Sequence, residues 1–333
     1  MTSMNFKKLL PQHYSLTKML WNLWCCVSVI GMWPRFIEPN LLKTTKISLP
    51  ILNLPPELSG LKVVQFTDLH FQPESSSFFL SKLSARIKSL SPDIVLFTGD
   101  FLCFSKMQQP ERLQAFLNSI NAPYGCFTIL GNHDYDRFIS VNQEGEYDVN
   151  RSISPTVSRG FRRLFKTIQL KNRITPAAQA SIVHPELIAL LKNTPFQLLH
   201  NETIQIAFKG ASLNLSGLGE YTAGKCDPER TFKTYDKKLP GIVMAHHPDS
   251  IDLLRDSPGD IILSGHTHGA QINLPWFRTK FTHLKNTHLV KGLVQMHGKR
   301  IYINRGVGSV MKFRWFSPPE LLLLTLESSH EHR

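Results

Sequence analysis

The chain has 333 residues, of which 42% are hydrophobic and 19% are charged, and this ordinary globular composition excludes a largely disordered protein. Its length allows one large domain or two smaller ones. With 38 Lys and Arg residues against 25 Asp and Glu residues, the net charge of +13 favours anionic partners: nucleic acid, phosphorylated substrates or an acidic membrane surface. The five cysteines form no spacing pattern, which indicates a reducing compartment rather than a disulfide framework.

The N-terminal segment has an apolar stretch without charges, Met19 to Trp33, that follows three lysines. This stretch is shorter than the roughly 20 residues that a simple transmembrane helix needs, and no small-residue cleavage site follows it. We therefore predict a helix that lies in the membrane interface with its tryptophans at the level of the headgroups. The alternative is a buried helix that packs on the domain. On the first interpretation, residues 1–45 form a membrane-associated segment and residues 46–333 form the main domain.

Strands and helices alternate in the first half of the chain. Hydrophobic periodicity predicts strands over 47–49, 61–66, 94–97 and 127–130, and helices over 79–90 and 113–120. This succession implies an α/β fold whose parallel strands are covered by helices on both faces. The second half is richer in strands, which we predict over 203–208, 213–218, 242–245, 261–263, 301–304 and 321–326.

A basic insertion is predicted between these halves, over residues 137–185. No acidic residue occurs from 149 to 185, and Phe161, Leu164, Phe165 and Ile168 share one face of a possible helix. A basic amphipathic helix suits a membrane surface or an anionic amphiphile. Because the insertion follows a loop with candidate site residues, we expect it to cap the site. The alternative is a solvated surface helix.

Five polar motifs each follow an apolar run. They are Asp68-Leu69-His70, Gly99-Asp100, Gly131-Asn132-His133-Asp134, Ala245-His246-His247-Pro248 and Gly265-His266-Thr267-His268-Gly269. Each is placed where a predicted strand meets a loop, and ligands of α/β sheets gather at such ends. Carboxylate and carboxamide oxygens mixed with imidazole nitrogens suit divalent metals such as Mn, Fe or Zn. The set is large enough for two ions, which points to a two-metal hydrolase.

The spacing suggests how these side chains would divide between two ions. Asp68 and His70 are two residues apart at a strand end, so we expect both on one face, gripping one ion. His266 and His268 repeat this spacing and could serve one ion each.

Three further positions complete the predicted arrangement. Asp100 could bridge both ions through its two oxygens, while Asn132 offers a neutral carbonyl oxygen. His246 would complete the second ion's set. Each motif alone is weak, since Gly99-Asp100 could also be a simple turn, but their conjunction at strand ends makes coincidence improbable.

The motif order resembles that of the calcineurin-like metallophosphoesterase family, whose pattern is D-x-H, G-D, G-N-H-[DE], H and G-H-x-H. The resemblance extends from about residue 60 to residue 327. It implies a four-layer α-β-β-α sandwich with two divalent metals between its sheets. Mn is the expected metal, with Fe, Zn or Mg as alternatives. The resemblance also implies the following ligands: Asp68, His70, Asp100 and His268 for the first metal, and Asp100, Asn132, His246 and His266 for the second.

The resemblance assigns roles to two neighbouring residues as well. His133 would protonate the leaving oxygen or stabilise the transition state, and Asp134 would support the site without binding metal. His246 is preferred over His247 because the family usually uses the histidine at the strand end. The phosphoprotein phosphatase motif G-D-x-V-D-R-G is replaced here by Gly99-Asp100-Phe101-Leu102-Cys103, so protein phosphatase activity is disfavoured.

The flanking segments resemble the membrane-associated bacterial branch of this family. Within that branch, they are similar to enzymes of lipid A biosynthesis that cleave UDP-2,3-diacylglucosamine into UMP and 2,3-diacylglucosamine 1-phosphate. This implies a lipid-linked nucleotide diphosphate substrate and a place on the cytoplasmic face of the inner membrane. We expect no nucleic-acid partner and no obligate protein partner. The alternatives are a general metal-dependent phosphodiesterase that acts on another lipid or nucleotide, and a non-catalytic binding scaffold on the same fold.

Overall fold

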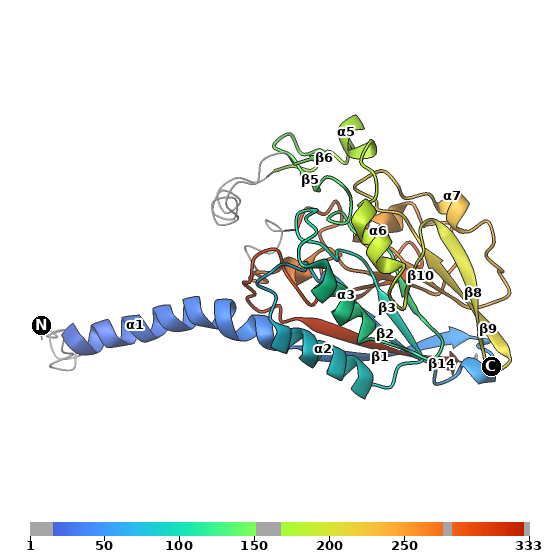
Figure 1. Ribbon diagram of the computed structural model, residues 1–333, viewed down its shortest axis with the longest axis horizontal. Helices are drawn as coiled ribbons and strands as arrows, with labels where there is room; N and C mark the ends of the chain where they lie inside the picture. Colours follow the sequence, from blue (N-terminus) through green and yellow to red (C-terminus); the bar gives the residue numbers. More distant parts are fainter. Residues whose placement is uncertain (1–15, 151–167, 276–281, 330–333) are drawn as a thin grey trace, which may run out of the picture.

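The computed structural model describes residues 16–150, 168–275 and 282–329. Its N-terminal helix, α1 (Leu16–Met32), projects away from the body of the molecule, as Figure 1 shows. None of the side chains of α1 is buried, so the structure does not support the alternative of a helix packed on the domain. Among the described helices, none is long and apolar enough to cross a bilayer.

The first of two six-stranded sheets has the order β1-β14-β2-β3-β4-β7. Its central strands β2, β3 and β4 are parallel to one another, as the alternation of strands and helices predicts. Strand β1 is longer than the predicted 47–49 because it pairs with β14 along its whole length. The bounds are β1 (Lys43–Leu52), β2 (Lys62–Phe66), β3 (Ile94–Phe97), β4 (Cys126–Thr128), β7 (Phe196–Leu198) and β14 (Glu320–Ser329).

Helices cover the outer face of this sheet. They are α2 (Ser77–Ser89), α3 (Pro110–Asn118) and α6 (Pro185–Leu191). Helix α2 begins where the hydroxyl of Ser76 accepts the backbone N–H of Phe79, and it buries Leu83 and Ile87 at helical spacing. These side chains join the buried face of β2 and β3 in one hydrophobic core.

The inner face packs against the second sheet, not against helices. The second sheet has the order β12-β13-β11-β10-β9-β8. Leu96 and Phe127 of the first sheet and Leu215 and Leu263 of the second share a hydrophobic core. The expectation of helices on both faces of the first sheet is therefore wrong, whereas the two-sheet sandwich is confirmed. The bounds are β8 (Glu202–Phe208), β9 (Ala211–Gly217), β10 (Gly241–Met244), β11 (Ile261–Ser264), β12 (Gly292–Met296) and β13 (Lys299–Ile303).

Short helices, α7 (Pro228–Thr231) and η5 (Pro248–Asp252), lie in the connections beside the second sheet. The predicted insertion contains the hairpin of β5 (Ile139–Val141) and β6 (Tyr147–Val149), followed by α5 (Pro176–Gln179). The predicted amphipathic helix over 161–168 lies almost entirely outside the described residues. Short strands such as β5, β6 and β7 were not predicted, because three residues give too little periodicity to recognise.

Candidate metal centre

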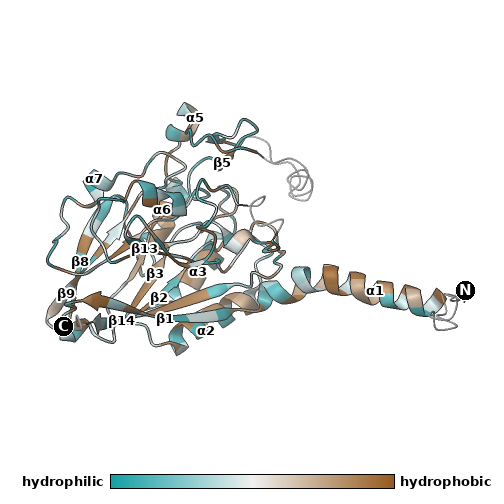
Figure 2. Cartoon of the chain, turned by 180° about the vertical axis from the view of Figure 1, so that it is seen from behind, coloured by the Kyte–Doolittle hydropathy of each residue, from teal (hydrophilic) through white to brown (hydrophobic). Residues whose placement is uncertain are grey.

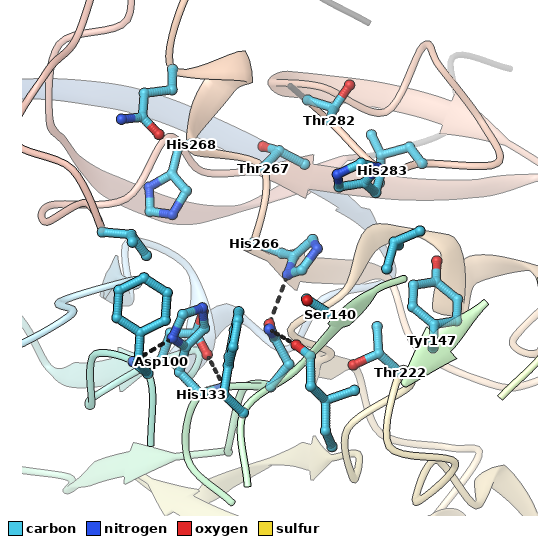
Figure 3. Close-up of a pocket in the computed structure, with 18 of the residues that line it drawn as sticks. Asp100, His133, Ser140, Tyr147, Thr222, His266, Thr267, His268, Thr282 and His283 are labelled. Carbon is cyan, nitrogen blue, oxygen red and sulfur yellow. Dashed lines mark hydrogen bonds between the residues drawn. The ribbon is translucent and has the colours of Figure 1, made fainter. Parts of the chain in front are cut away.

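The predicted ligands follow five strands and meet at one end of the sandwich. In the first sheet, β2 leads to Asp68 and His70, β3 to Asp100, and β4 to Asn132. In the second sheet, β10 leads to His246 and β11 to His266 and His268. The described chain contains three groups of acidic and imidazole side chains whose donor atoms lie within 4.8 Å of one another, and all of these groups are here. Figure 3 shows Asp100, His133, His266 and His268 facing a common space.

One group consists of Asp68, His70 and His268. The Nε2 atoms of His70 and His268 lie 3.0 Å apart, and that of His268 lies 3.6 Å from an oxygen of Asp68. Two imidazole nitrogens and a carboxylate oxygen thus surround one small volume. This is the set that the family resemblance implies for the first metal, together with Asp100, whose Oδ2 lies 3.5 Å from Nε2 of His70.

A second group consists of Asp100, His246 and His266. The Nδ1 atom of His246 lies 2.7 Å from the carbonyl oxygen of Thr98, which fixes the ring with Nε2 toward Asp100. That Nε2 lies 3.2 Å from Asp100 Oδ2 without hydrogen-bond geometry, and it is buried without a hydrogen-bond partner among the described residues. Asn132 belongs to the same end, since its Oδ1 lies 3.0 Å from Nδ1 of His266.

The loop backbone, rather than strand alternation, brings these pairs together. Strand β2 ends at Phe66, and both Asp68 and His70 lie beyond it with φ of 54° and 43°. His266 and His268 also have positive φ, at 68° and 52°. The expectation that Asp68 and His70 share one face of an extended strand is therefore wrong in its geometry, although both side chains reach the same group. Left-handed backbone is costly for residues with a Cβ, and such conformations concentrate at functional sites.

Two glycines leave room for the carboxylates. A Cβ at Gly131 would lie 2.2 Å from an oxygen of Asp100, and a Cβ at Gly306 would lie 2.7 Å from Cβ of Asp68. Gly306 also has a φ of 71°, which favours glycine independently of space. The closeness of the backbone at these positions holds both carboxylates in place.

Burial controls the charges in this centre. Burial raises the pKa of Asp68 to about 7 and lowers the pKa of His70 to about 4. For Asp100, burial would raise the pKa, but His246 and His133 hold it well below its usual range. For His246, burial would lower the pKa, but the carboxylate of Asp100 raises it well above its usual range. A divalent cation would favour the ionised carboxylates and the neutral imidazoles, which are the forms that bind metal.

These features fit a pair of divalent ions. The two groups supply mixed oxygen and nitrogen donors, the Nε2 of His246 has no hydrogen-bond partner in the described part of the chain, and Asp100 contacts both groups. In such an arrangement Asp68, His70, Asp100 and His268 would hold one ion, and Asp100, Asn132, His246 and His266 the other.

Asp134 stabilises the loops that carry the predicted ligands. Its carboxylate accepts the backbone N–H groups of Asp100 at 2.8 Å, of Gly131 at 3.0 Å and of Leu102 at 3.0 Å. It is fully buried, and burial raises its pKa to about 8. Asp134 thereby ties the loop after β4 to the loop that carries Asp100.

His133 lies beside the metal groups, at the wall of a cavity of about 180 Å³. Its Nδ1 accepts the backbone N–H of Phe104 at 2.9 Å, and its ring contacts Phe138. The third group of donor atoms joins His133 to His70 and Asp100, so proximity alone does not separate a ligand from a substrate-binding residue here.

Several cavity residues were not predicted from the sequence. Phe104, Phe138, Tyr147, Thr222, Thr282 and Met311 line the same cavity as His133. Of these, Phe138 and Tyr147 belong to the predicted insertion, so its described part contributes to the cavity wall. The remaining residues stand in no recognisable motif, and only the folding of the chain brings them to the metal groups.

Comparison with known proteins agrees with this geometry. The sequence profile of the calcineurin-like phosphoesterases matches residues 61–270. The chain belongs to the calcineurin-like phosphoesterase family. This family's fold and its use of divalent metals account for the two-sheet sandwich and for the donor groups at its end.

Relatives within this family include two chlamydial enzymes. The UDP-2,3-diacylglucosamine pyrophosphatase LpxG of Chlamydia trachomatis is 40% identical over 310 residues, which cover 88% of this chain and 92% of the relative. The protein of the same name from Chlamydia muridarum is 38% identical with the same coverage. The phosphodiesterase YaeI of Escherichia coli is 27% identical and covers 80% of this chain and 82% of its own.

Proposed function

We propose that this phosphoesterase is a UDP-2,3-diacylglucosamine diphosphatase of lipid A biosynthesis. It would hydrolyse the diphosphate of a lipid-linked nucleotide and release UMP and 2,3-diacylglucosamine 1-phosphate. The observation that carries this proposal is the 38–40% identity to two enzymes named for this activity, over almost the whole chain. The donor groups around Asp100 support the reaction class, and the cavity beside them supports an amphiphilic substrate.

The chain's own residues would bind and orient the diphosphate. When bound, two divalent ions, for which we propose Mn, supply the charge that activates a water molecule and offsets charge on the phosphate oxygens. Asp100 would fix the spacing of the two ions because it contacts both groups of donors. The hydrogen bonds from the backbone of Asp100 and Gly131 to Asp134 would keep this spacing while substrate binds and product leaves.

His133 would act on the substrate from the wall of the cavity. Because Nδ1 accepts an N–H from the backbone of Phe104, the proton of the neutral ring resides on Nε2. Burial lowers the pKa of His133 to about 3, which favours this neutral form. A fixed Nε2–H donor beside the metals would stabilise charge on a phosphate oxygen and donate a hydrogen bond to the leaving oxygen.

The cavity has both polar and apolar walls. Thr222, Thr282 and His266 offer polar atoms, whereas Phe138, Val141, Ile272, Leu284 and Met311 are apolar. Such a mixture suits a ligand with a charged centre between a nucleoside and a lipid.

We also propose that the enzyme acts at the cytoplasmic face of the inner membrane. Helix α1 is coloured mostly as hydrophobic in Figure 2, and its tryptophans Trp21 and Trp24 are 65% and 63% exposed. Phe36 and Phe316 on the body are exposed as well. Their arrangement supports attachment to a bilayer by an interfacial helix.

A second candidate function is a phosphodiesterase with a different lipid or nucleotide substrate. The similarity to the phosphodiesterase YaeI favours it, because that relative also covers most of the chain. Both candidates predict hydrolysis of a phosphate ester or anhydride, so only the substrate separates them.

The experiment is turnover of UDP-2,3-diacylglucosamine in detergent micelles, with UMP as the product measured. A simple phosphodiester, bis-p-nitrophenyl phosphate, is assayed in parallel with the same Mn-loaded protein. Release of UMP that saturates with the lipid substrate supports the proposal. Brisk turnover of the simple phosphodiester without UMP release overturns the lipid assignment in favour of the second candidate. Absence of both activities, together with a metal content below about one ion per chain that added Mn does not restore, supports a binding scaffold.

A further inference from the structure

A second cavity, of about 220 Å³, lies between the segment that follows α1 (residues 35–40), the beginning of α2 and the loop over residues 307–314. Leu69, Phe79, Leu80 and Val307 form an apolar part of its wall, and polar residues, among them Gln72, Ser75, Ser76 and Ser309, line the rest. Its volume exceeds the roughly 150 Å³ of an apolar protein cavity that takes up benzene. It therefore has room for a stretch of one hydrocarbon chain, but not for a complete lipid.

This cavity adjoins the metal centre. Val310 lines both this cavity and the one at His133, so the two are separated there by one residue of the loop. His70, a predicted metal ligand, also lies in its wall. The buried guanidinium of Arg314 forms part of the same wall, with Nη2 3.5 Å from Nδ1 of His268. The second cavity therefore shares wall residues with the metal centre and with the first cavity.

The rim of the cavity is mainly cationic and lies at the base of α1. Arg35 and Lys312 are exposed lining residues, and Arg35 Nη1 donates to the carbonyl of Lys312 at 3.1 Å. Glu74, also exposed, contributes an opposite charge to the wall. Figure 1 shows α2 beginning where α1 joins the body, so the cavity lies where the proposed membrane helix meets the enzyme.

We propose that this second cavity binds one acyl chain of the lipid substrate. The inference rests on the proposed function, because it assigns a place to the lipid part of the same substrate. The apolar part of the wall, beside Val310, would hold the hydrocarbon chain, and the cations at the rim would face the anionic membrane surface. The lipid would enter along α1, whose exposed apolar side chains continue to the rim through Phe36 and Ile37. The nucleoside would remain in the first cavity, whose wall includes Thr222 and Thr282.

The position of Phe79 offers a direct test. Phe79 is half-buried in the cavity wall, whereas its neighbour Phe78 is 80% exposed on the same helix and is not part of that wall. Phe79→Trp adds volume inside the cavity, and Phe78→Trp makes the same chemical change outside it. The pair therefore separates filling of the cavity from a general effect of tryptophan on α2.

The experiment is photolabelling of the full-length, metal-loaded protein in detergent micelles. Two probes carry a diazirine at the end of one acyl chain: UDP-2,3-diacylglucosamine and phosphatidylglycerol. Mass spectrometry locates the labelled residues in the parent chain and in both variants. We expect label within residues 69–80 and 307–314, reduced about fivefold or more by Phe79→Trp because the bulkier ring fills the space, and unchanged by Phe78→Trp. Unfolding midpoints establish that both variants are folded.

The outcomes distinguish this inference from the proposed function. Label in the second cavity from both probes supports the acyl site and the proposed substrate. Label there from phosphatidylglycerol but not from the nucleotide lipid supports an acyl site and counts against the proposed substrate. Label confined to residues 138–147 or 282–284 places the chain in the first cavity and overturns the inference. Label that is absent from the second cavity, or equal in Phe79→Trp and the parent chain, overturns it as well.

Discussion

The carboxylate of Glu38 accepts the backbone N–H of Ser317 at 2.5 Å, although the two residues are far apart in the sequence. Glu38 belongs to the short segment after α1, whereas the hydroxyl of Ser317 donates to the carbonyl of His268 at 2.6 Å. Glu38 also accepts the backbone N–H of Phe316 and the indole N–H of Trp33, each at 3.0 Å. Two successive hydrogen bonds, through Ser317, therefore connect this buried carboxylate after the N-terminal helix to the backbone of His268, a predicted metal ligand.

We predict that Glu38→Gln weakens this connection. The amide has one accepting oxygen where the carboxylate has two, so a buried N–H loses its partner at a cost of about 1–3 kcal/mol. The free energy of unfolding, measured by denaturant titration, should fall by that amount, and turnover should fall with it. Glu57→Gln is the matched control because Glu57 is exposed. Equal stability of the two variants would contradict the structural role of Glu38.

Asp100→Asn should abolish hydrolysis and lower the metal content. An amide offers one neutral oxygen where the shared carboxylate offers two charged ones, so both ions lose affinity. We expect turnover of bis-p-nitrophenyl phosphate to fall by more than about 100-fold, since even changes to residues behind metal ligands cost 10–100-fold. Elemental analysis should find fewer than two ions per chain. The exposed Asp256 provides the control, Asp256→Asn. Full activity of Asp100→Asn would refute a shared carboxylate.

His133→Ala should separate catalysis from metal binding. Removal of a positioned hydrogen-bond donor to developing charge typically lowers kcat by about 10²–10³-fold. Because the proposed ligand sets do not include His133, the variant should retain the metal content of the parent protein. Steady-state kinetics and elemental analysis on the same preparation measure both effects. Loss of metal together with activity would show instead that His133 is a ligand.

Gly131→Ala should disturb the metal centre by steric collision alone. The added methyl group would collide with the carboxylate of Asp100, because its Cβ would lie 2.2 Å from the oxygen that accepts the N–H of His133. A misplacement of this kind can cost about 10²-fold in rate. Gly31→Ala in α1 is the control, since no atom lies within 4 Å of the position of its Cβ. Activity of Gly131→Ala within about twofold of the parent chain would argue against the close packing at Asp100.

Membrane attachment is expected to depend on the exposed apolar side chains of α1. Trp21→Asp places a charge in the proposed bilayer-facing surface, whereas Asn22→Asp places the same charge at a position that is already polar. In vesicles that contain anionic lipid, the Trp21 variant should sediment less with the lipid than the parent chain, by about tenfold if apolar transfer dominates binding. The Asn22 variant should bind nearly as the parent does. Equal sedimentation of all three proteins would contradict an interfacial role for α1.

The residue pattern alone predicted the family and the order of the main elements. Apolar runs that end in Asp68, Asp100, Asn132, His246 and His266 are visible without coordinates, because buried strands require hydrophobic residues and the chemistry requires polar ones after them. The family pattern then indicated which side chains share a metal. Long elements such as α2 were also predictable, because their periodicity extends over several turns.

The way in which these motifs meet depends on contacts between segments that are remote in the chain. Strand alternation does not bring Asp68 and His70 together, since both lie beyond β2 in left-handed conformations that are maintained by contacts with distant segments. The contact from Glu38 through Ser317 to His268 and the shared wall at Val310 join segments that are remote in the chain. Local sequence encodes propensity and periodicity, whereas packing between remote segments fixes loop conformation and cavity shape.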